Sequence, residues 1–305
     1  MSQEPHQDRD RKIEKIASRH LGKSKQYIDK YDINLLVKIP RSYNRELYNI
    51  SNDSLPFVGY DVWNAYEVSF LTNKSLPVSG VLKIKILANT IYMVESKSLK
   101  LYLNSFNMTS LGENTEKSIA AFEGLVSKDL SGLLESKVEC VFYRTEQDST
   151  NFAVDYVELR DLVDLDSISF SLNQNVSSEL KYTDQLSEYE IVKFQTDLLR
   201  SNCRVTNQPD WGNVYIYMES AFRPDYKSIA RFIVSHRKIN HFHEEVSEML
   251  YMKLMEAYKP ERLMVVCLYT RRGGIDINPL RASDSNLIPE SFTNIQKFNK
   301  RTIRQ

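Results

Sequence analysis

The chain has 305 residues, enough for about two domains of ordinary size, and it carries 40 basic and 40 acidic side chains. A formal net charge of zero excludes the overall positive field that draws a protein onto nucleic acid or an anionic membrane. Its three cysteines lack CxxC spacing, which argues against a disulfide framework or a structural zinc module. We therefore expect a protein of a reducing compartment, the cytoplasm.

The first residues are strongly polar. From Met1 to Lys15 acidic and basic side chains are interspersed, which excludes the apolar core of a secretory signal and predicts a frayed tail over residues 1–20. No apolar run approaches the ~20 residues needed to span a bilayer, so we expect a soluble protein without a membrane partner. The nine glycines form neither G-x-G-x-x-G nor a P-loop. A Rossmann or Walker-type nucleotide site is therefore excluded.

The segment 21–60 is punctuated by prolines and glycines and predicts a wrapping segment rich in loops. The pattern then becomes regular. Residues 63–71 and 82–86 alternate between larger apolar and smaller or polar side chains, which is the period of half-buried strands. The residues between them, 73–80, include a proline and predict a hairpin connection.

Two amphipathic helices are predicted after this strand pair. Apolar side chains between residues 99 and 106 recur at positions i, i+3, i+4 and i+7, and a second stripe of this kind spans residues 119–130. Residues 137–143 and 152–159 return to strand character. The first half of the chain thus predicts the order strand, strand, helix, helix, strand, strand.

A polar passage then separates two halves of the chain. It follows an acid-rich run and is poor in large apolar side chains, so we predict a linker over residues 166–190. The first module then covers residues 21–165 and the second covers residues 191–305.

The second module repeats the order of the first. Residues 191–206 and 214–218 predict strands, 229–236 and 246–254 each carry an apolar helical stripe, and 263–269 predict a closing strand. Repetition of one pattern without sequence identity implies a tandem of two similar α+β units. Periodicity alone would also fit a ferredoxin-like sandwich.

One cysteine has surroundings that suit chemistry. Cys140 and Cys267 lie in apolar strands and indicate inert packing, whereas Cys203 has polar neighbours and lies seven residues before Asp210. A thiol of ordinary pKa needs a base or a nearby cation to react at neutral pH. Because an ionised Asp would raise the thiol pKa, Cys203 and Asp210 suit proton transfer better than thiolate stabilisation. A buried, unreactive Cys203 remains the alternative.

Two further polar groups lie where helices are predicted to begin. Glu95, Ser96 and Lys97 stand at a strand-to-helix junction, where unpaired N–H groups suit a phosphate or carbonyl ligand, although helix capping would also explain them. The run from His241 to Glu245 reads H-F-H-E-E. It suits a solvated first helical turn, or, with Cys203, a set of three zinc ligands.

Four stretches together resemble the QueF family, the NADPH-dependent 7-cyano-7-deazaguanine reductases. The run CRVTNQPDWG from Cys203 is similar to the family's nucleophile segment, and ESKSLKLYLNSFN from Glu95 is similar to its signature. His243-Glu244 and the run TRRGGIDINP at 270–279 are similar to its C-terminal blocks. Since the signature lies in the first half and the cysteine in the second, the chain resembles the long, two-module form.

The resemblance implies a fold and a reaction. The fold is a pair of tandem tunnelling-fold modules, each a four-stranded antiparallel sheet with two helices between its second and third strands. In the reaction Cys203 adds to the substrate nitrile to give a covalent thioimide, Asp210 shuttles the proton, and His243 helps to hold or protonate the nitrile end. Two hydride transfers from NADPH then give the primary amine, a step toward queuosine in tRNA.

The resemblance also implies site residues and partners. The substrate, a small 7-deazaguanine, would be contacted by Val94, Glu95, Ser96, His243 and Glu244. NADPH would be contacted by Ser96, Lys97, Arg272 and Gly273. The resemblance further implies a homodimer without a metal and without direct contact to nucleic acid.

One position departs from the family, and two other functions stay open. Where the family usually has an acid two residues before His243, this chain has His241, which changes the charge beside the matched pair. A zinc-dependent pterin enzyme resembling GTP cyclohydrolase I would share the fold and use Cys203 with His241 or His243. A binding module that has lost turnover is a third alternative, which the presence of both Cys203 and Asp210 disfavours.

Overall fold

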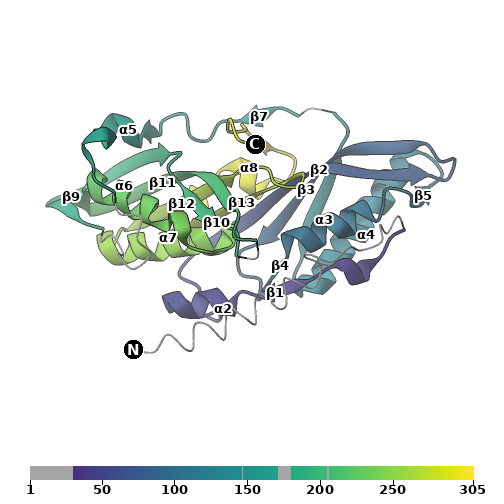
Figure 1. The fold of residues 1–305 in the computed structure, drawn as a ribbon, viewed down its shortest axis with the longest axis horizontal. Coiled ribbons are helices and arrows are strands. Elements are labelled where there is room, and N and C mark those ends of the chain that lie inside the picture. Colours follow the sequence, from purple (N-terminus) through teal and green to yellow (C-terminus); the bar gives the residue numbers. More distant parts are fainter. Residues whose placement is uncertain (1–29, 146, 171–179, 205) are drawn as a thin grey trace.

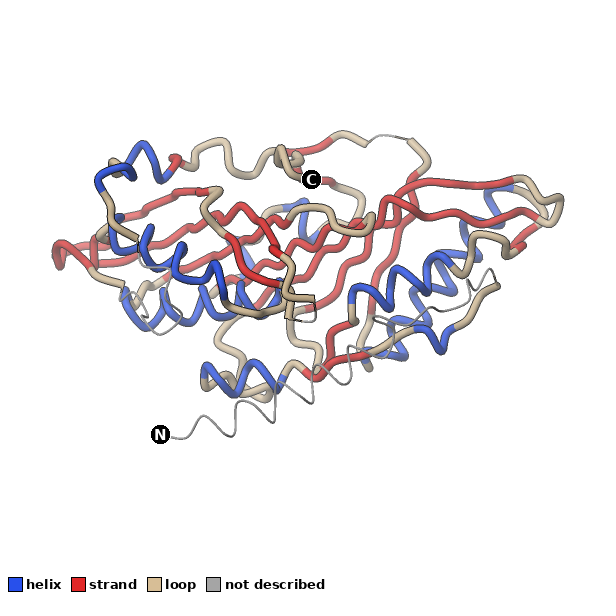
Figure 2. The backbone as a smooth tube through the Cα atoms, in the orientation of Figure 1, coloured by secondary structure: helices blue, strands red, loops and turns tan. Residues whose placement is uncertain are grey.

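The computed structural model describes the chain in four stretches, residues 30–145, 147–170, 180–204 and 206–305. The tail predicted for residues 1–20 and residues 171–179 of the predicted linker lie outside the described residues. The strands run as one layer along the molecule, and the longer helices pack along it (Figure 1 and Figure 2). The predicted α+β class is confirmed.

Short elements precede the first long strand, as the wrapping segment predicted for residues 21–60 required. They are η2 (Ile33–Leu35), β1 (Lys38–Pro40), α2 (Ser42–Arg45) and η3 (Glu46–Tyr48). β1 pairs in antiparallel register with β4 (Tyr92–Val94), so that Lys38 lies opposite Val94. This pairing holds the wrapping segment against the start of the first long helix.

The first module contributes three strands to the main sheet. β2 (Val58–Thr72) and β3 (Pro77–Leu87) form the predicted hairpin, and β6 (Val138–Tyr143) pairs with β3. Helices α3 (Ser96–Asn104) and α4 (Thr115–Leu134) lie between β3 and β6 in the chain, and the short β5 (Ser110–Gly112) pairs with β2. The apolar faces of strands and helices meet in an aromatic core, in which Phe70 stacks on Phe122 with ring centroids 4.7 Å apart.

The second module has the four strands and two helices that the resemblance implied, whereas the apolar pattern had predicted three of the strands. Its strands are β9 (Tyr182–Thr196), β11 (Pro209–Pro224), β12 (Arg262–Tyr269) and β13 (Ile275–Ala282), all antiparallel to their neighbours. Helices α6 (Tyr226–Ser235) and α7 (His243–Tyr258) connect β11 to β12, with η5 (His236–Lys238) between them. A short strand, β10 (Arg200–Asn202), also pairs with β11. This is the helix placement expected of the tunnelling fold.

The first strand of this module begins earlier than predicted. β9 starts at Tyr182, inside the predicted linker, and its first part pairs with β11 from Tyr182 opposite Pro224 to Glu190 opposite Ser220. Most side chains of this part are exposed, so it lacks the apolar alternation that marks a half-buried strand. Backbone pairing forms the strand here together with surface contacts to β11, namely the ring of Tyr182 on that of Phe222 and the pairs of Arg223 with Asp184 and Glu190. The strand also ends at Thr196, and the predicted strand over residues 191–206 continues only as the separate β10.

The predicted strand over residues 152–159 is wrong. Only β8 (Val157–Glu158) is extended there, and it pairs in parallel with β9 of the second module. The apolar alternation has another cause, because Phe152 and Tyr156 pack over the far face of the sheet against Tyr215, with ring centroids 5.1 and 6.0 Å away. The remaining short elements are β7 (Ser149–Thr150), α5 (Leu159–Leu162), η4 (Leu165–Ser167), η6 (Ser285–Leu287), α8 (Glu290–Thr293) and β14 (Phe298–Asn299).

One strand from each module joins the two halves into a continuous sheet. β13 pairs with β2 from Ile275 opposite Ala65 to Ala282 opposite Val58, which gives the strand order β6-β3-β2-β13-β12-β11-β9-β8. Alternate residues of β12 and β13 face the helices on one side and the cluster around Tyr215 on the other. Among the described residues no helix is long and apolar enough to cross a membrane.

Candidate active site

A cavity of about 370 Å³ lies where the two modules meet, on the helix-bearing face. All ten predicted site residues line it, and they are Val94, Glu95, Ser96, Lys97, Cys203, Asp210, His243, Glu244, Arg272 and Gly273. Eight further lining residues were not predicted, namely Trp63, Met93, Lys100, Thr206, Gln208, Phe242, Ile275 and Ile277. The fold therefore brings side chains more than 100 positions apart in the sequence into one concave site.

Glu95 forms the wall contributed by the first module and caps helix α3. Its carboxylate oxygens accept hydrogen bonds from the backbone N–H groups of Lys97, at 3.0 Å, and Ser98, at 2.6 Å. Burial raises the pKa of Glu95 above its usual range, although these two N–H groups oppose the shift. The capping role considered from the sequence is therefore real, and it fixes the position of a carboxylate that also lines the cavity.

Cys203 lies in the loop between β10 and β11. Its backbone N–H donates to the carbonyl of Gln208 at 2.8 Å, and its own carbonyl accepts from Asn207 at 3.0 Å. Asn207 adopts the left-handed conformation, with a φ of 54°, which closes the loop. The thiol is half-buried and free. Burial raises the pKa of the Cys140 thiol and of the Cys267 thiol, as expected for inert packing.

Asp210 is a buried carboxylate with two partners of positive or potentially positive charge. Its Oδ2 lies 3.3 Å from Nε2 of His243, and its Oδ1 accepts a hydrogen bond from the guanidinium of Arg272. Arg272 also donates to Oε1 of Gln208 at 2.6 Å. Burial opposes ionisation of Asp210, but His243 and Arg272 outweigh it and bring the pKa of this carboxyl below its usual value. Asp210 is therefore held as a carboxylate, the form that can take up a proton.

His243 begins helix α7 and lies flat on Tyr269. The two rings are parallel within 6° and their centroids are 3.8 Å apart. Nε2 of the ring faces Asp210. The other ring nitrogen, Nδ1, is buried and has no hydrogen-bond partner among the described residues. A buried polar atom without a partner at a cavity wall suits a ligand contact.

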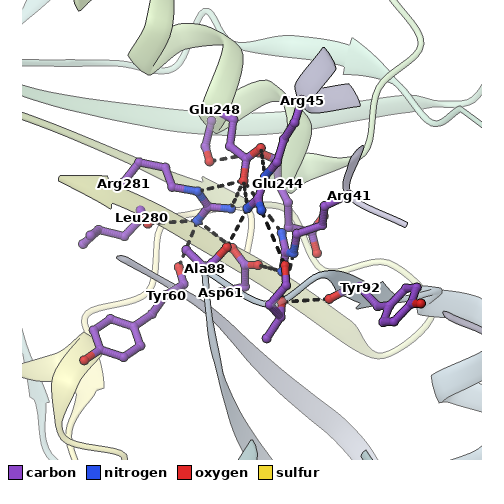
Figure 3. Close-up of polar contacts among 12 residues, drawn as sticks. Arg41, Arg45, Tyr60, Asp61, Ala88, Tyr92, Glu244, Glu248, Leu280 and Arg281 are labelled. Carbon is purple, nitrogen blue, oxygen red and sulfur yellow. Dashed lines mark hydrogen bonds and ion pairs between the residues drawn. The ribbon is translucent and has the colours of Figure 1, made fainter. Parts of the chain in front are cut away.

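Glu244 borders a buried cluster of five charged side chains that links the modules, and Figure 3 shows how they converge. Asp61 lies 2.5 Å from Arg41 and 2.8 Å from Arg281. Glu248 of α7 lies 2.8 Å from Arg45 and 3.0 Å from Arg281. The five residues Arg41, Arg45, Asp61, Glu248 and Arg281 are hereafter the interface cluster.

The interface cluster affects the ionisation of Glu244. Burial raises the pKa of Glu244 to about 7, the negative charge of Asp61 adds to the rise, and the positive charges of Arg41 and His243 oppose it. A carboxyl of this pKa changes charge near neutral pH. Such a group is typical of a functional cleft.

His241, the residue that departs from the family pattern, does not line the cavity. Its Nδ1 lies 3.3 Å from Oε2 of Glu245 and 3.1 Å from Nη2 of Arg204, and its Nε2 lies 3.3 Å from the hydroxyl of Tyr48. Arg204 in turn lies 2.9 Å from Glu245, which ties the Cys203 loop to helix α7. His241 thus belongs to a buried structural network next to the site.

The zinc ligand set considered from the sequence is not assembled. It required His241, His243 and Cys203 around one ion, but His241 is directed to Glu245 and Tyr48. In the part of the chain that the structure describes, no three His, Cys, Asp or Glu side chains are grouped so that they could hold a metal ion. The spacing of His241 and His243 suggested two ligands of one ion, but the contacts of His241 with Glu245 and Tyr48 direct it away from that position.

Comparison with protein families agrees with this arrangement. A model described as nitrile reductase, 7-cyano-7-deazaguanine-reductase N-term, matches residues 27–142. A second, described as QueF-like protein, matches residues 209–286. The chain belongs to the QueF family. The two matches lie on the two modules in order, so it is a two-module QueF protein.

Among solved structures, the archaeosine synthase QueF-Like in its apo form is similar at 20% identity, with a TM-score of 0.29. The alignment covers 32% of this chain and 96% of the other. At that TM-score the likeness adds no argument about the fold, which the strand order above already describes.

The lining of this QueF site fits an anionic cofactor. Lys97, Lys100 and Arg272 line the cavity together with Gly273. Gly273 has a φ of 57°, and a Cβ there would lie 3.3 Å from the Lys100 side chain. A side chain at position 273 would thus be strained and would crowd a cation, whereas glycine leaves the backbone open to a phosphate. These residues fit a nucleotide cofactor, whose phosphates carry the negative charge.

Proposed function

We propose that this QueF protein reduces the nitrile of 7-cyano-7-deazaguanine to 7-aminomethyl-7-deazaguanine with NADPH, through a covalent thioimide, in the route to queuosine. One observation carries the proposal. A single cavity gathers the free thiol of Cys203, the buried carboxylate of Asp210 and a His243 ring whose Nδ1 has no partner in the described part of the chain. Those are a nucleophile, a proton acceptor and a hydrogen-bonding group for a polarised substrate.

The first step is addition of the thiol across the nitrile. A bond forms between Sγ of Cys203 and the nitrile carbon, and one carbon–nitrogen π bond breaks. Asp210 accepts the thiol proton and returns it to the nitrile nitrogen, so the thioimide keeps every atom of both partners and Asp210 ends as a carboxylate. While it carries the thiol proton, Asp210 can donate a hydrogen bond to the nitrile nitrogen, on which negative charge develops.

Two reductions complete the reaction. When bound, NADPH would supply a hydride in each of them, with a matching proton from solvent. After the first hydride the carbon–sulfur bond breaks, a proton moves from nitrogen to Sγ so that Cys203 is a free thiol again, and the imine that remains is reduced to the primary amine by the second hydride. Ser96, Lys97, Arg272 and Gly273 would hold this cofactor, and Lys100, which pairs with Glu67 at 3.1 Å, adds a further cation to the lining. Trp63, Ile275 and Ile277 add apolar surface to the cavity lining, which would help to keep water from a partly reduced intermediate.

The substrate heterocycle would lie between the two carboxylates of the site. Glu244 would accept from the ring N–H groups, with Glu95, Val94 and Ser96 on the other side. Because a carboxylate has about four lone-pair sites and Glu95 accepts from two backbone N–H groups, Glu95 can take further donors, and an ionised Glu244 would accept from two ring N–H groups at once. The cytoplasmic location and the homodimer stay predictions.

The test is formation of the adduct without cofactor. Mixed with the cyano substrate alone, the protein should gain the full mass of the substrate, because addition expels no atom. Cys203→Ala should abolish the gain, whereas Cys140→Ala and Cys267→Ala should leave it intact. Intact-protein mass spectrometry measures it, and an adduct that survives in Cys203→Ala would mean that the covalent route is wrong.

A further inference from the structure

Arg272 contacts a buried carboxylate on one side and is partly exposed to solvent on the other. Its guanidinium donates to Oδ1 of Asp210 and to Oε1 of Gln208, yet its side chain is 31% exposed, whereas that of Asp210 is 3% exposed. The resemblance implied a role for Arg272 at the cofactor. The structure pairs the same guanidinium with the carboxylate that is to move the proton.

The backbone that carries Arg272 is fixed, but its side chain has room to move. Arg272 and Ile275 exchange backbone hydrogen bonds of 2.9 and 3.1 Å across a tight turn between β12 and β13. The turn residues Gly273 and Gly274 have φ values of 57° and 79°, as in a two-residue hairpin of the primed type. A change of partner therefore requires only rotation of the half-exposed side chain.

The surroundings make Asp210 depend on this contact. Arg272, from the turn, is a permanent cation, whereas His243, from helix α7, is charged only when protonated. Tyr269, from β12, and Glu244, from α7, are the further titratable groups on this side of the cavity, and Cys203 lies in the loop before β11. Burial opposes the ionised form of Asp210, His243 is the larger influence against burial and Arg272 the smaller, so loss of the guanidinium would leave His243 alone to oppose burial and would raise the pKa of Asp210.

We propose that Arg272 is a positioning residue that holds Asp210 as a carboxylate while Cys203 adds to the nitrile, and that it leaves Asp210 when its guanidinium binds an anionic group of the cofactor. The inference rests on the proposed function. In the addition step Asp210 must begin without a proton, because it takes the proton of the thiol. In the reductions the substrate nitrogen gains protons that come from solvent, and a carboxyl relieved of Arg272 holds such a proton more readily.

The experiment follows adduct formation against pH in the absence of hydride donor. The rate of adduct formation is measured by rapid mixing, quenching and mass spectrometry for the wild type, Arg272→Ala and Arg272→Lys. In Arg272→Ala the acid side of the profile should move to higher pH, with a rate lower by on the order of tenfold at the acid end, since a directly paired opposite charge shifts a carboxyl pKa by a unit or more. Arg272→Lys, which keeps the charge, should lie between the two.

Arg271→Ala is the matched control. It removes the neighbouring guanidinium, which lies over the ring of Tyr66 at 3.4 Å and does not line the cavity, so it should leave the profile unchanged. In a second arm NADP⁺, which carries the phosphates but no hydride, is added to each protein. It should shift the wild-type profile toward that of Arg272→Ala and leave Arg272→Ala where it is.

The outcomes separate this inference from the proposed function. Absence of any wild-type adduct at every pH would contradict the proposed function itself. A normal wild-type adduct with superimposable profiles in Arg272→Ala and Arg272→Lys would overturn the positioning role alone. A profile that NADP⁺ shifts equally in the wild type and in Arg272→Ala would overturn the exchange of partners.

Discussion

Glu244 shows most clearly how burial and charge oppose each other at a single side chain. Its pKa of about 7 in the folded protein lies above the ordinary carboxyl value of 4.5. Between these two values the folded state binds more protons at this group than the unfolded state does. Its contribution to stability is therefore fully present below about pH 4.5 and is lost as the pH rises through about 7.

Replacing Glu244 by Gln should remove this loss. In the absence of substrate the variant should be more stable than the wild type at pH 8 by about 1 to 3 kcal/mol, and the difference should vanish toward pH 5. Urea unfolding at several pH values measures it, with Glu256→Gln, an exposed acid on the same helix, as the control. Parallel stability curves for the wild type and Glu244→Gln would show that Glu244 is ionised throughout this range.

Single residues differ in how far the sequence could predict them. Cys203 stood out from Cys140 and Cys267 because its polar neighbours are local in the sequence. Trp63 and Gln208 were missed, since a strand residue and a loop amide give no signal until the other wall of the cavity is in place. Arg272 was expected at the cofactor, and its pairing with Asp210 depends on a contact across 62 positions.

Helix α7 is the element on which the site and the module interface both depend. His243 and Glu244 in its first turn line the cavity, and Glu248, one turn further on, accepts from Arg45 and Arg281. Spacing of four residues places Glu244 and Glu248 on one helical face. The interface cluster therefore sets the rotation of α7 that directs its first turn into the cavity.

Glu248→Gln should destabilise the protein by about 3 to 5 kcal/mol, because it leaves buried guanidinium groups without their counter-charge. Glu256→Gln is the control on the same helix, since Glu256 pairs with Lys253 at the surface and exposed pairs contribute little. Denaturant unfolding of both variants measures the effect. Equal, small changes would mean that water or rearrangement satisfies the arginines of the interface cluster.

Elements with strong apolar periodicity were predicted well, and strand segments with mostly exposed side chains were not. Helices α3, α4, α6 and α7 follow apolar stripes that the sequence displays. The start of β9 at Tyr182 was missed, because exposed strand residues show no alternation. Residues 152–159 misled for the opposite reason, since Phe152 and Tyr156 alternate to pack on the far face of the sheet rather than to form a strand.

Over the whole molecule, the order of the strands decides where the site can form. β13 and β2 lie side by side in the middle of the sheet, so the helix-bearing faces of the two modules meet above that pair. The sequence predicted two modules of one pattern. It could not show that they share a sheet, because pairing between distant strands leaves no local signal.

The meeting of both walls within one chain has a genetic consequence. A chain with Cys203→Ala keeps Glu95 but lacks the thiol, and a chain with a substituted Glu95 keeps the thiol but lacks that carboxylate. Because each chain builds its own cavity, neither variant can complete the site of the other. Co-expression of the two should fail to restore reduction of the nitrile, even in mixed dimers. Recovery of activity in such a cell would mean that complete sites assemble between chains. Intragenic complementation thus tests, in a living cell, whether a single polypeptide contains a complete active site.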